Sequence, residues 1–234
     1  METQNKYLLL ARRAREEDNA EDAKKYYDMV RTEDPDNAEA KFFYSYYHMY
    51  SGKVGEAVHN YLTLCKGIDS TLKMIIASEC ADEEKKALIK SMLNCIITAY
   101  GSAKSAYYKV NTGSIVEIKE AYYKSMENIA KMYIDNFGAD DGVIETYYTI
   151  QSEQYSHPDS LFRYANEIEC QYSASPKLMA LAVKFWKGCV NNKENGEAAI
   201  AKIQKYDPTY VAPTPKEGFA DKLIKKITTL IGKK

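Results

Sequence analysis

The chain has 234 residues with a formal net charge of −1, of which 45% are hydrophobic and 28% charged. This length suffices for a sizeable core, and the balanced charge provides no global field that would attract nucleic acid. Five widely spaced cysteines without a C-x-x-C pair argue against a disulfide framework. The opening "METQNKY" is too polar for a signal peptide, and no run approaches the roughly 20 apolar residues of a membrane span. We therefore expect a cytoplasmic protein with reduced thiols.

Helical periodicity runs through nearly the whole chain, and no segment alternates as a strand does. Asn19, Ser114 and Ser175 precede periodic segments and are residue types that cap helices. Gly67 and Gly101 indicate a helix end and a break. We expect about 12 helices: 3–17, 19–34, 37–52, 54–66, a stretch over 69–110 broken near 81–82 and near 101, then 114–138, 141–154, 156–172, one from 175 that contains Trp186, one within 195–208, and 215–232.

One helical pattern occurs twice near the N-terminus, in the segments 21–37 and 55–69. Each has a small residue, an aromatic residue four positions later and an apolar residue three positions after that. A small residue lets two helices approach, and the larger residues fill the space beside it. The matching positions are Ala23, Tyr27 and Val30 in the first segment and Ala57, Tyr61 and Leu64 in the second.

The interval of 34 residues between these positions resembles that of the tetratricopeptide repeat, a helix–turn–helix unit. Two units at 4–37 and 38–71 follow this pattern, and a degenerate one at 177–210 keeps the second-helix spacing. The resemblance implies an all-α fold, a right-handed superhelical stack of antiparallel helical hairpins. The expected organisation is two repeat-like hairpins at 1–71, divergent helical hairpins at 72–174, the degenerate hairpin at 175–210, and a linker with a C-terminal helix at 211–234.

In that family the first helix of each pair lines a concave groove, which binds extended peptides or helices of partner proteins. The resemblance therefore implies a partner-binding groove at the following residues: Arg12, Arg15, Phe42, Tyr46 and Met49. Arginine offers bidentate donors to carboxylate or phosphate, and the aromatic residues offer apolar contact. The family's carboxylate clamp of Lys and Asn is absent, because Leu8, Arg12, Phe42 and Tyr46 occupy those positions. Recognition of acidic chaperone tails is therefore not expected.

A structural interpretation competes with this groove. The arginines at 12, 13 and 15 are followed by Glu16, Glu17 and Asp18, and ion pairs on a solvated face would account for them. The aromatic residues would then pack between helices. The same applies to the tyrosine pairs at 107–108, 122–123 and 147–148, because adjacent helical residues point about 100° apart and one of each pair can be buried.

No pattern of residues indicates catalysis. The three histidines (48, 59 and 157) are scattered, and neither a nucleophile signature nor a phosphate-binding loop is present. We predict no enzyme activity, no metal and no cofactor. No basic stripe accompanies the tyrosines, so binding of nucleic acid is not expected either.

The C-terminal segment predicts a basic amphipathic helix behind a proline-containing linker. Three interpretations stay open: it covers the end of the helical array, lies on an anionic membrane surface, or docks on a partner or a second copy. Its candidate contact residues are Phe219, Leu223, Ile227 and Leu230 on the apolar face, and Lys222, Lys225 and Lys226 on the basic face.

The function expected from these features is a non-catalytic adaptor or scaffold that binds a protein partner in a concave, tyrosine-rich groove. The alternative is a peripheral membrane protein that uses the 215–232 helix as its contact. A third hypothesis is an enzyme with an unrecognised site.

Overall fold

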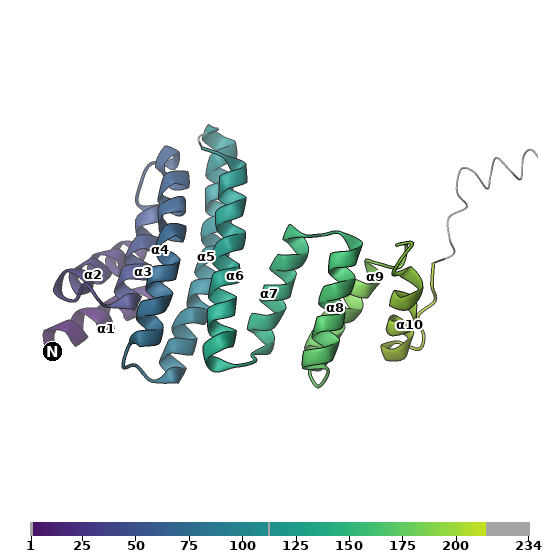
Figure 1. The fold of residues 1–234 in the computed structure, drawn as a ribbon. Coiled ribbons are helices and arrows are strands. Elements are labelled where there is room, and N and C mark those ends of the chain that lie inside the picture. Colours follow the sequence, from purple (N-terminus) through teal and green to yellow (C-terminus); the bar gives the residue numbers. More distant parts are fainter. Residues whose placement is uncertain (1, 112, 214–234) are drawn as a thin grey trace, which may run out of the picture. The chain divides into compact units, whose positions relative to one another are not determined.

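The computed structural model describes residues 2–111 and 113–213, with side chains from Lys6 onward. These residues form α-helices and one short 3₁₀ helix, and they contain no strand (Figure 1). The expected all-α class is confirmed. The elements are α1 Glu2–Glu16, α2 Ala20–Glu33, α3 Ala38–Tyr50, η1 Val54–Glu56, α4 Ala57–Ala77, α5 Asp82–Val110, α6 Ile115–Phe137, α7 Asp141–Gln154, α8 Pro158–Tyr172, α9 Pro176–Lys187 and α10 Gly196–Tyr206.

The described residues contain ten α-helices rather than about twelve, because two predicted interruptions are wrong. α4 continues through Gly67, and α5 continues through Gly101. Glycine inside a helix costs only about 0.5–1 kcal/mol relative to alanine. Burial of residues beside each glycine, such as Ile68 and Ala103, offsets that cost. The predicted helix at 215–232 lies outside the described residues.

The three predicted helix caps are confirmed. The side chains of Asn19, Ser114 and Ser175 accept a hydrogen bond from a backbone N–H in the first turn of α2, α6 and α9, and Asn37 does the same for α3. These caps satisfy donors that a helix N-terminus otherwise leaves unpaired. They are local interactions, which is why the sequence alone indicates them.

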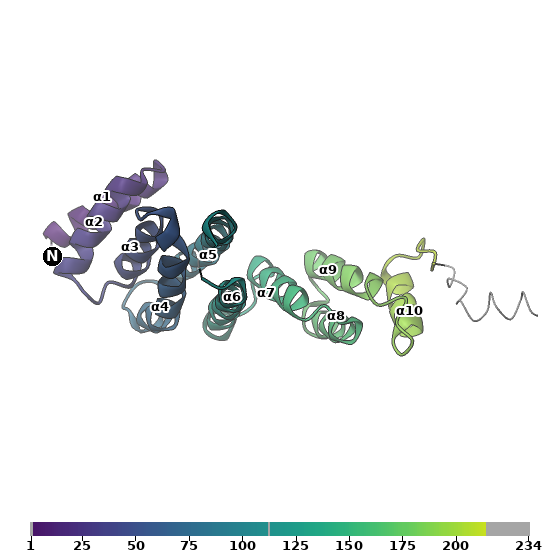
Figure 2. The same ribbon diagram turned by 90° about the horizontal axis from the view of Figure 1, so that it is seen from above.

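The described chain divides into two compact units, one ending at Gln154 and one beginning at Tyr155. In the first, α1 packs on α2, α3 on α4 and α5 on α6, so sequential helices form three hairpins, and α7 packs on α6. α3 also contacts α5, and α4 contacts α6, so the first and second helices of the second and third hairpins lie in two layers (Figure 2). In the second unit, α9 packs on both α8 and α10.

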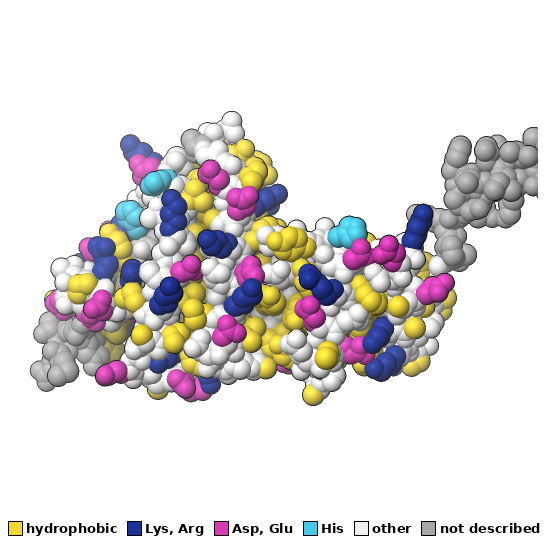
Figure 3. Space-filling view, viewed as in Figure 1, with side chains coloured by type: hydrophobic (Ala, Val, Ile, Leu, Met, Phe, Trp, Pro, Cys, Tyr) yellow, Lys and Arg dark blue, Asp and Glu magenta, His cyan; other side chains and the backbone are white. Residues whose placement is uncertain are grey.

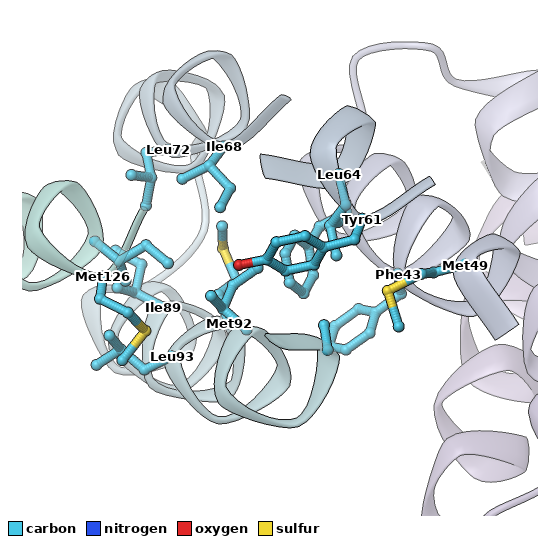
Figure 4. Close-up of a cluster of buried hydrophobic side chains, with 14 of the residues drawn as sticks. Phe43, Met49, Tyr61, Leu64, Ile68, Leu72, Ile89, Met92, Leu93 and Met126 are labelled. Atoms are coloured by element: carbon cyan, nitrogen blue, oxygen red, sulfur yellow. The ribbon is translucent and has the colours of Figure 1, made fainter. Parts of the chain in front are cut away.

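Five of the six residues of the repeated small, aromatic and apolar pattern are buried at helix contacts of the first unit, and the exception is Ala57, which is half-buried. Ala23, Tyr27 and Val30 are fully buried in α2, and the Tyr27 ring stacks on Phe43 with 5.2 Å between centroids. In α4, Tyr61 is likewise fully buried and lies near Phe43 and Met92 (Figure 4). The pattern therefore marks residues whose function is packing.

Two of the three tyrosine pairs divide as expected for packing. Tyr122 and Tyr148 are buried, whereas Tyr123 and Tyr147 are half-buried. Tyr122 stacks on Tyr100 with 4.1 Å between centroids, which joins α6 to α5. In the third pair, Tyr108 keeps 68% of its surface exposed at the end of α5.

In the second unit, Trp186 of α9 anchors the core. Its side chain is fully buried, its Nε1 donates to Oδ1 of Asn166 at 3.2 Å, and its ring stacks on Tyr206 with 6.0 Å between centroids. These contacts join α9 to α8 and to α10.

Candidate functional site

A groove lies between the first helices of the three hairpins in the first unit. It consists of two adjoining hollows of about 230 and 260 Å³, and both are lined by Arg12, Glu39, Glu84 and Leu88. These residues come from α1, α3 and α5, and we call the two hollows together the α1–α3–α5 groove. The larger hollow also reaches Arg15, and the smaller one extends toward the α2–α3 and α4–α5 connections.

An ion pair with hydrogen bonds forms the middle of the groove. Nε of Arg12 lies 3.1 and 3.0 Å from the two carboxylate oxygens of Glu39, and its Nη2 donates to Oε2 at 2.6 Å. The Glu39 side chain is only 10% exposed, and the Tyr27 hydroxyl donates to its Oε1 at 2.9 Å. The hydrogen bond with Glu39 raises the pKa of Arg12, although burial opposes the shift. The network ties α1, α2 and α3 together.

Arg15 contacts the carboxylate of Glu39 as well, together with an aromatic ring. Its Nη1 is 3.7 Å from Oε1 of Glu39, and its guanidinium lies 4.3 Å from the centroid of the Phe43 ring. Arg13 instead pairs with Glu17 at 2.9 Å on the exposed side of α1. Of the two interpretations, local pairing holds for Arg13, whereas Arg12 and Arg15 turn toward α3. Their donors contact Glu39 and thereby build the wall of the groove.

The predicted groove residues of α3, namely Phe42, Tyr46 and Met49, lie mostly inside the protein. Phe42 and Met49 are each 2% exposed, and Tyr46 is half-buried. Tyr46 stacks on Phe42 with 6.3 Å between centroids, and burial raises the pKa of its hydroxyl. Neither Phe42 nor Tyr46 lines the α1–α3–α5 groove. Met49 lines a different hollow of about 460 Å³ between α3 and α5, together with Tyr50 and Val54.

The groove includes residues that sequence reasoning did not select. In the sequence, Asp34 and Asp36 stand beside Pro35 and indicate a connection between two helices. Glu84 and Leu88 have the pattern of an ordinary helix surface. The two predicted repeat units end at residue 71, so they do not include α5, which is the first helix of the third hairpin. If the alternation of first and second helices is extended beyond residue 71, it predicts that α5 lines the groove. This alternation is the one sequence signal that could have identified Leu88 as a groove residue.

The candidate contact residues of the C-terminal segment lie outside the described residues; these are Phe219, Lys222, Leu223, Lys225, Lys226, Ile227 and Leu230. Residues 2–111 and 113–213 contain no group of three or more His, Cys, Asp or Glu side chains placed to hold a metal ion. No helix in the same ranges combines the length and the apolar character needed to cross a membrane. All five cysteines carry free thiols.

Charges of both signs are interspersed on the face shown in Figure 3, where Lys and Arg alternate with Asp and Glu over α4, α5 and α6. Comparisons of the chain with protein-family models, with curated proteins and with solved structures found no match.

Proposed function

We propose that this protein is a non-catalytic adaptor that binds a peptide or helix of a partner protein in the α1–α3–α5 groove. One observation carries the proposal: the first helices of three successive hairpins all line a single groove. This is the arrangement that the resemblance to tetratricopeptide repeats implies for partner binding.

The chemical character of the groove supports a protein ligand. Its smaller hollow is lined by the half-buried Leu8 and Leu88 and by the buried Ala38 and Ile75, and charged side chains lie beside them. Protein interfaces combine an apolar centre with a polar rim in this way. The accessible apolar side chains, Leu8 and Leu88, come from α1 and α5, so one bound segment would touch both helices.

The groove is also held in shape before any partner arrives. Two nitrogens of Arg12 donate hydrogen bonds to Glu39, and the Tyr27 hydroxyl donates a third to the same carboxylate. A surface that is already ordered loses less conformational entropy on binding. The proposal places the contact on Leu8 and Leu88 rather than on tyrosines, because Phe42 and Tyr46 pack within the helix array.

Site-specific photo-crosslinking tests this function. A photoreactive amino acid is placed at Leu88 in the groove or, as a matched control, at Val116, which is 58% exposed on α6. The protein crosslinked at Leu88 and not at Val116 is then purified, and its affinity for the intact chain is measured. We expect Leu88→Asp to weaken that affinity at least about tenfold and Val116→Asp to leave it unchanged, with circular dichroism showing that both variants are folded. Equal capture at both positions, or equal affinity of both variants, would refute the groove as the binding surface.

A further inference from the structure

The smaller hollow of the α1–α3–α5 groove contains more carboxylates than cations. Its charged residues are Asp34, Asp36, Glu39 and Glu84 against Arg12 and Lys85, which gives four negative and two positive charges and a net charge of −2. In the adjoining hollow, Arg12 and Arg15 balance Glu39 and Glu84. The excess negative charge therefore lies at the end beside the α2–α3 connection.

Both cations of the smaller hollow already have acceptors within the protein. Arg12 is paired with Glu39, and Nζ of Lys85 donates to the backbone oxygen of Ile76 at 3.1 Å, at the C-terminal end of α4. Among the described residues, neither Asp36 nor Glu84 forms a side-chain hydrogen bond or ion pair, and both are exposed. The groove therefore offers carboxylate acceptors to a ligand, whereas each cation of the smaller hollow already has an acceptor within the protein.

The size and the apolar lining of the hollow suit one long side chain. A cavity of about 150 Å³ can hold a benzene molecule, and this hollow measures about 230 Å³. The half-buried side chains of Leu8 and Leu88 provide apolar surface for a methylene stem. Lysine and arginine bury such stems along apolar surface while the charged end stays near water or an acceptor.

From this geometry we propose that the groove recognises a basic amphipathic segment of another protein, and that a lysine or arginine of this segment inserts into the hollow beside Asp34 and Asp36. This inference rests on the proposed function and adds the chemistry of the partner. It reverses the preference that Arg12 and Arg15 suggest in the sequence, because Glu39 and Glu84 together balance the charge of the two arginines that would have attracted an acidic ligand.

Cys80 provides a reporter for occupancy of the hollow. It lines the hollow and is exposed, and Cys170 on α8 is an exposed thiol outside it. The intact chain is alkylated with iodoacetamide, and the modification of each cysteine is followed by mass spectrometry. Two probes are compared: a short amphipathic leucine–lysine peptide, and the same peptide with glutamate in place of every lysine. Cys170 serves as the internal control for changes in general reactivity.

We expect the lysine peptide to bind, to slow the alkylation of Cys80 and to leave Cys170 unchanged, while the glutamate peptide does neither. The double variant Asp34→Asn and Asp36→Asn should bind the lysine peptide about tenfold more weakly, because two carboxylates near the bound cation are lost. A matched variant, Glu120→Gln and Asp135→Asn, removes two exposed carboxylates of α6 and should change the affinity less than about twofold.

Three results would overturn the inference. The first is protection of Cys80 by the glutamate peptide, or no protection by either peptide. The second is equal affinity of the two double variants for the lysine peptide. The third is an increase in Cys80 reactivity when residues 214–234 are deleted, because the chain's own basic segment would then be the occupant. If crosslinking at Leu88 still captures a specific partner in any of these cases, the proposed function stands and the charge inference alone is wrong.

Discussion

Replacing Glu39 by alanine tests whether the buried carboxylate holds the first three helices together. Glu39 accepts hydrogen bonds from Arg12 of α1 and from Tyr27 of α2 while it stands at the start of α3. Removing it therefore breaks contacts across two helix interfaces. We expect a clear loss of stability of the unit that ends at Gln154.

The two contacts contribute unequally. Tyr27 is fully buried, and a buried hydroxyl without its acceptor costs about 1–3 kcal/mol. The Arg12 side chain is 42% exposed, so water can solvate its guanidinium, and the loss of its ion pair costs at most about 1 kcal/mol. Together we expect a decrease of about 2–3 kcal/mol in the free energy of unfolding.

Urea denaturation followed by circular dichroism measures this loss, and hydrogen exchange of the α1–α3 amides assigns it to the correct unit, since the single tryptophan lies in the other one. Glu16→Ala replaces an exposed glutamate of α1 and is the matched control. It should change the free energy of unfolding by less than about 0.5 kcal/mol. In a Tyr27→Phe background, Glu39→Ala should cost about 1–2 kcal/mol less, because no hydroxyl is left unpaired. The reasoning would be refuted if the effects of Glu39→Ala and Tyr27→Phe were additive. It would also be refuted if Glu39→Ala alone lowered the free energy of unfolding by less than about 0.5 kcal/mol.

Three further predictions concern helix continuity, acid stability and thiol reactivity. Gly67→Ala and Gly101→Ala should each raise the free energy of unfolding by about 0.5–1 kcal/mol, because both glycines lie inside helices with open space around a new Cβ. Gly113→Ala should lower it, since Gly113 has φ +85° and its Cβ would lie 2.8 Å from Val58; thermal melts compare all three variants. Burial alone would raise the pKa of Glu169, but hydrogen bonds from Lys202, Lys205 and Tyr206 outweigh it and lower the pKa to about 2. The stability that this carboxylate provides should be complete above about pH 4.5 and lost as the pH falls toward 2, and urea midpoints in this range should fall less for Glu169→Gln than for the unmodified chain. Exposed Cys80 and Cys170 should react rapidly with a thiol reagent, whereas burial raises the pKa of Cys95 and Cys189 to about 11 and should delay them until urea is added; rapid modification of Cys189 in the folded chain would contradict this account.

The sequence determined the all-α class, most helix bounds and the burial of five of the six residues in the repeated pattern. These features depend on neighbours within one or two turns: an apolar face with a period of 3.6 residues, and a side chain such as Asn19 that caps the next turn. Ala23 and Tyr27 could be assigned to a helix contact because their spacing alone places them on one face.

Only the tertiary structure decided the composition of the groove. Whether Gly67 ends a helix depends on the burial that residues such as Ile68 gain from other helices, which local propensity does not include. The partner of Arg12 is Glu39, 27 residues away, rather than a glutamate on its own helix. The packing of the three hairpins places Leu88 beside these residues in the groove. The sign of the net charge in the smaller hollow follows from the four carboxylates and two cations that this packing brings together.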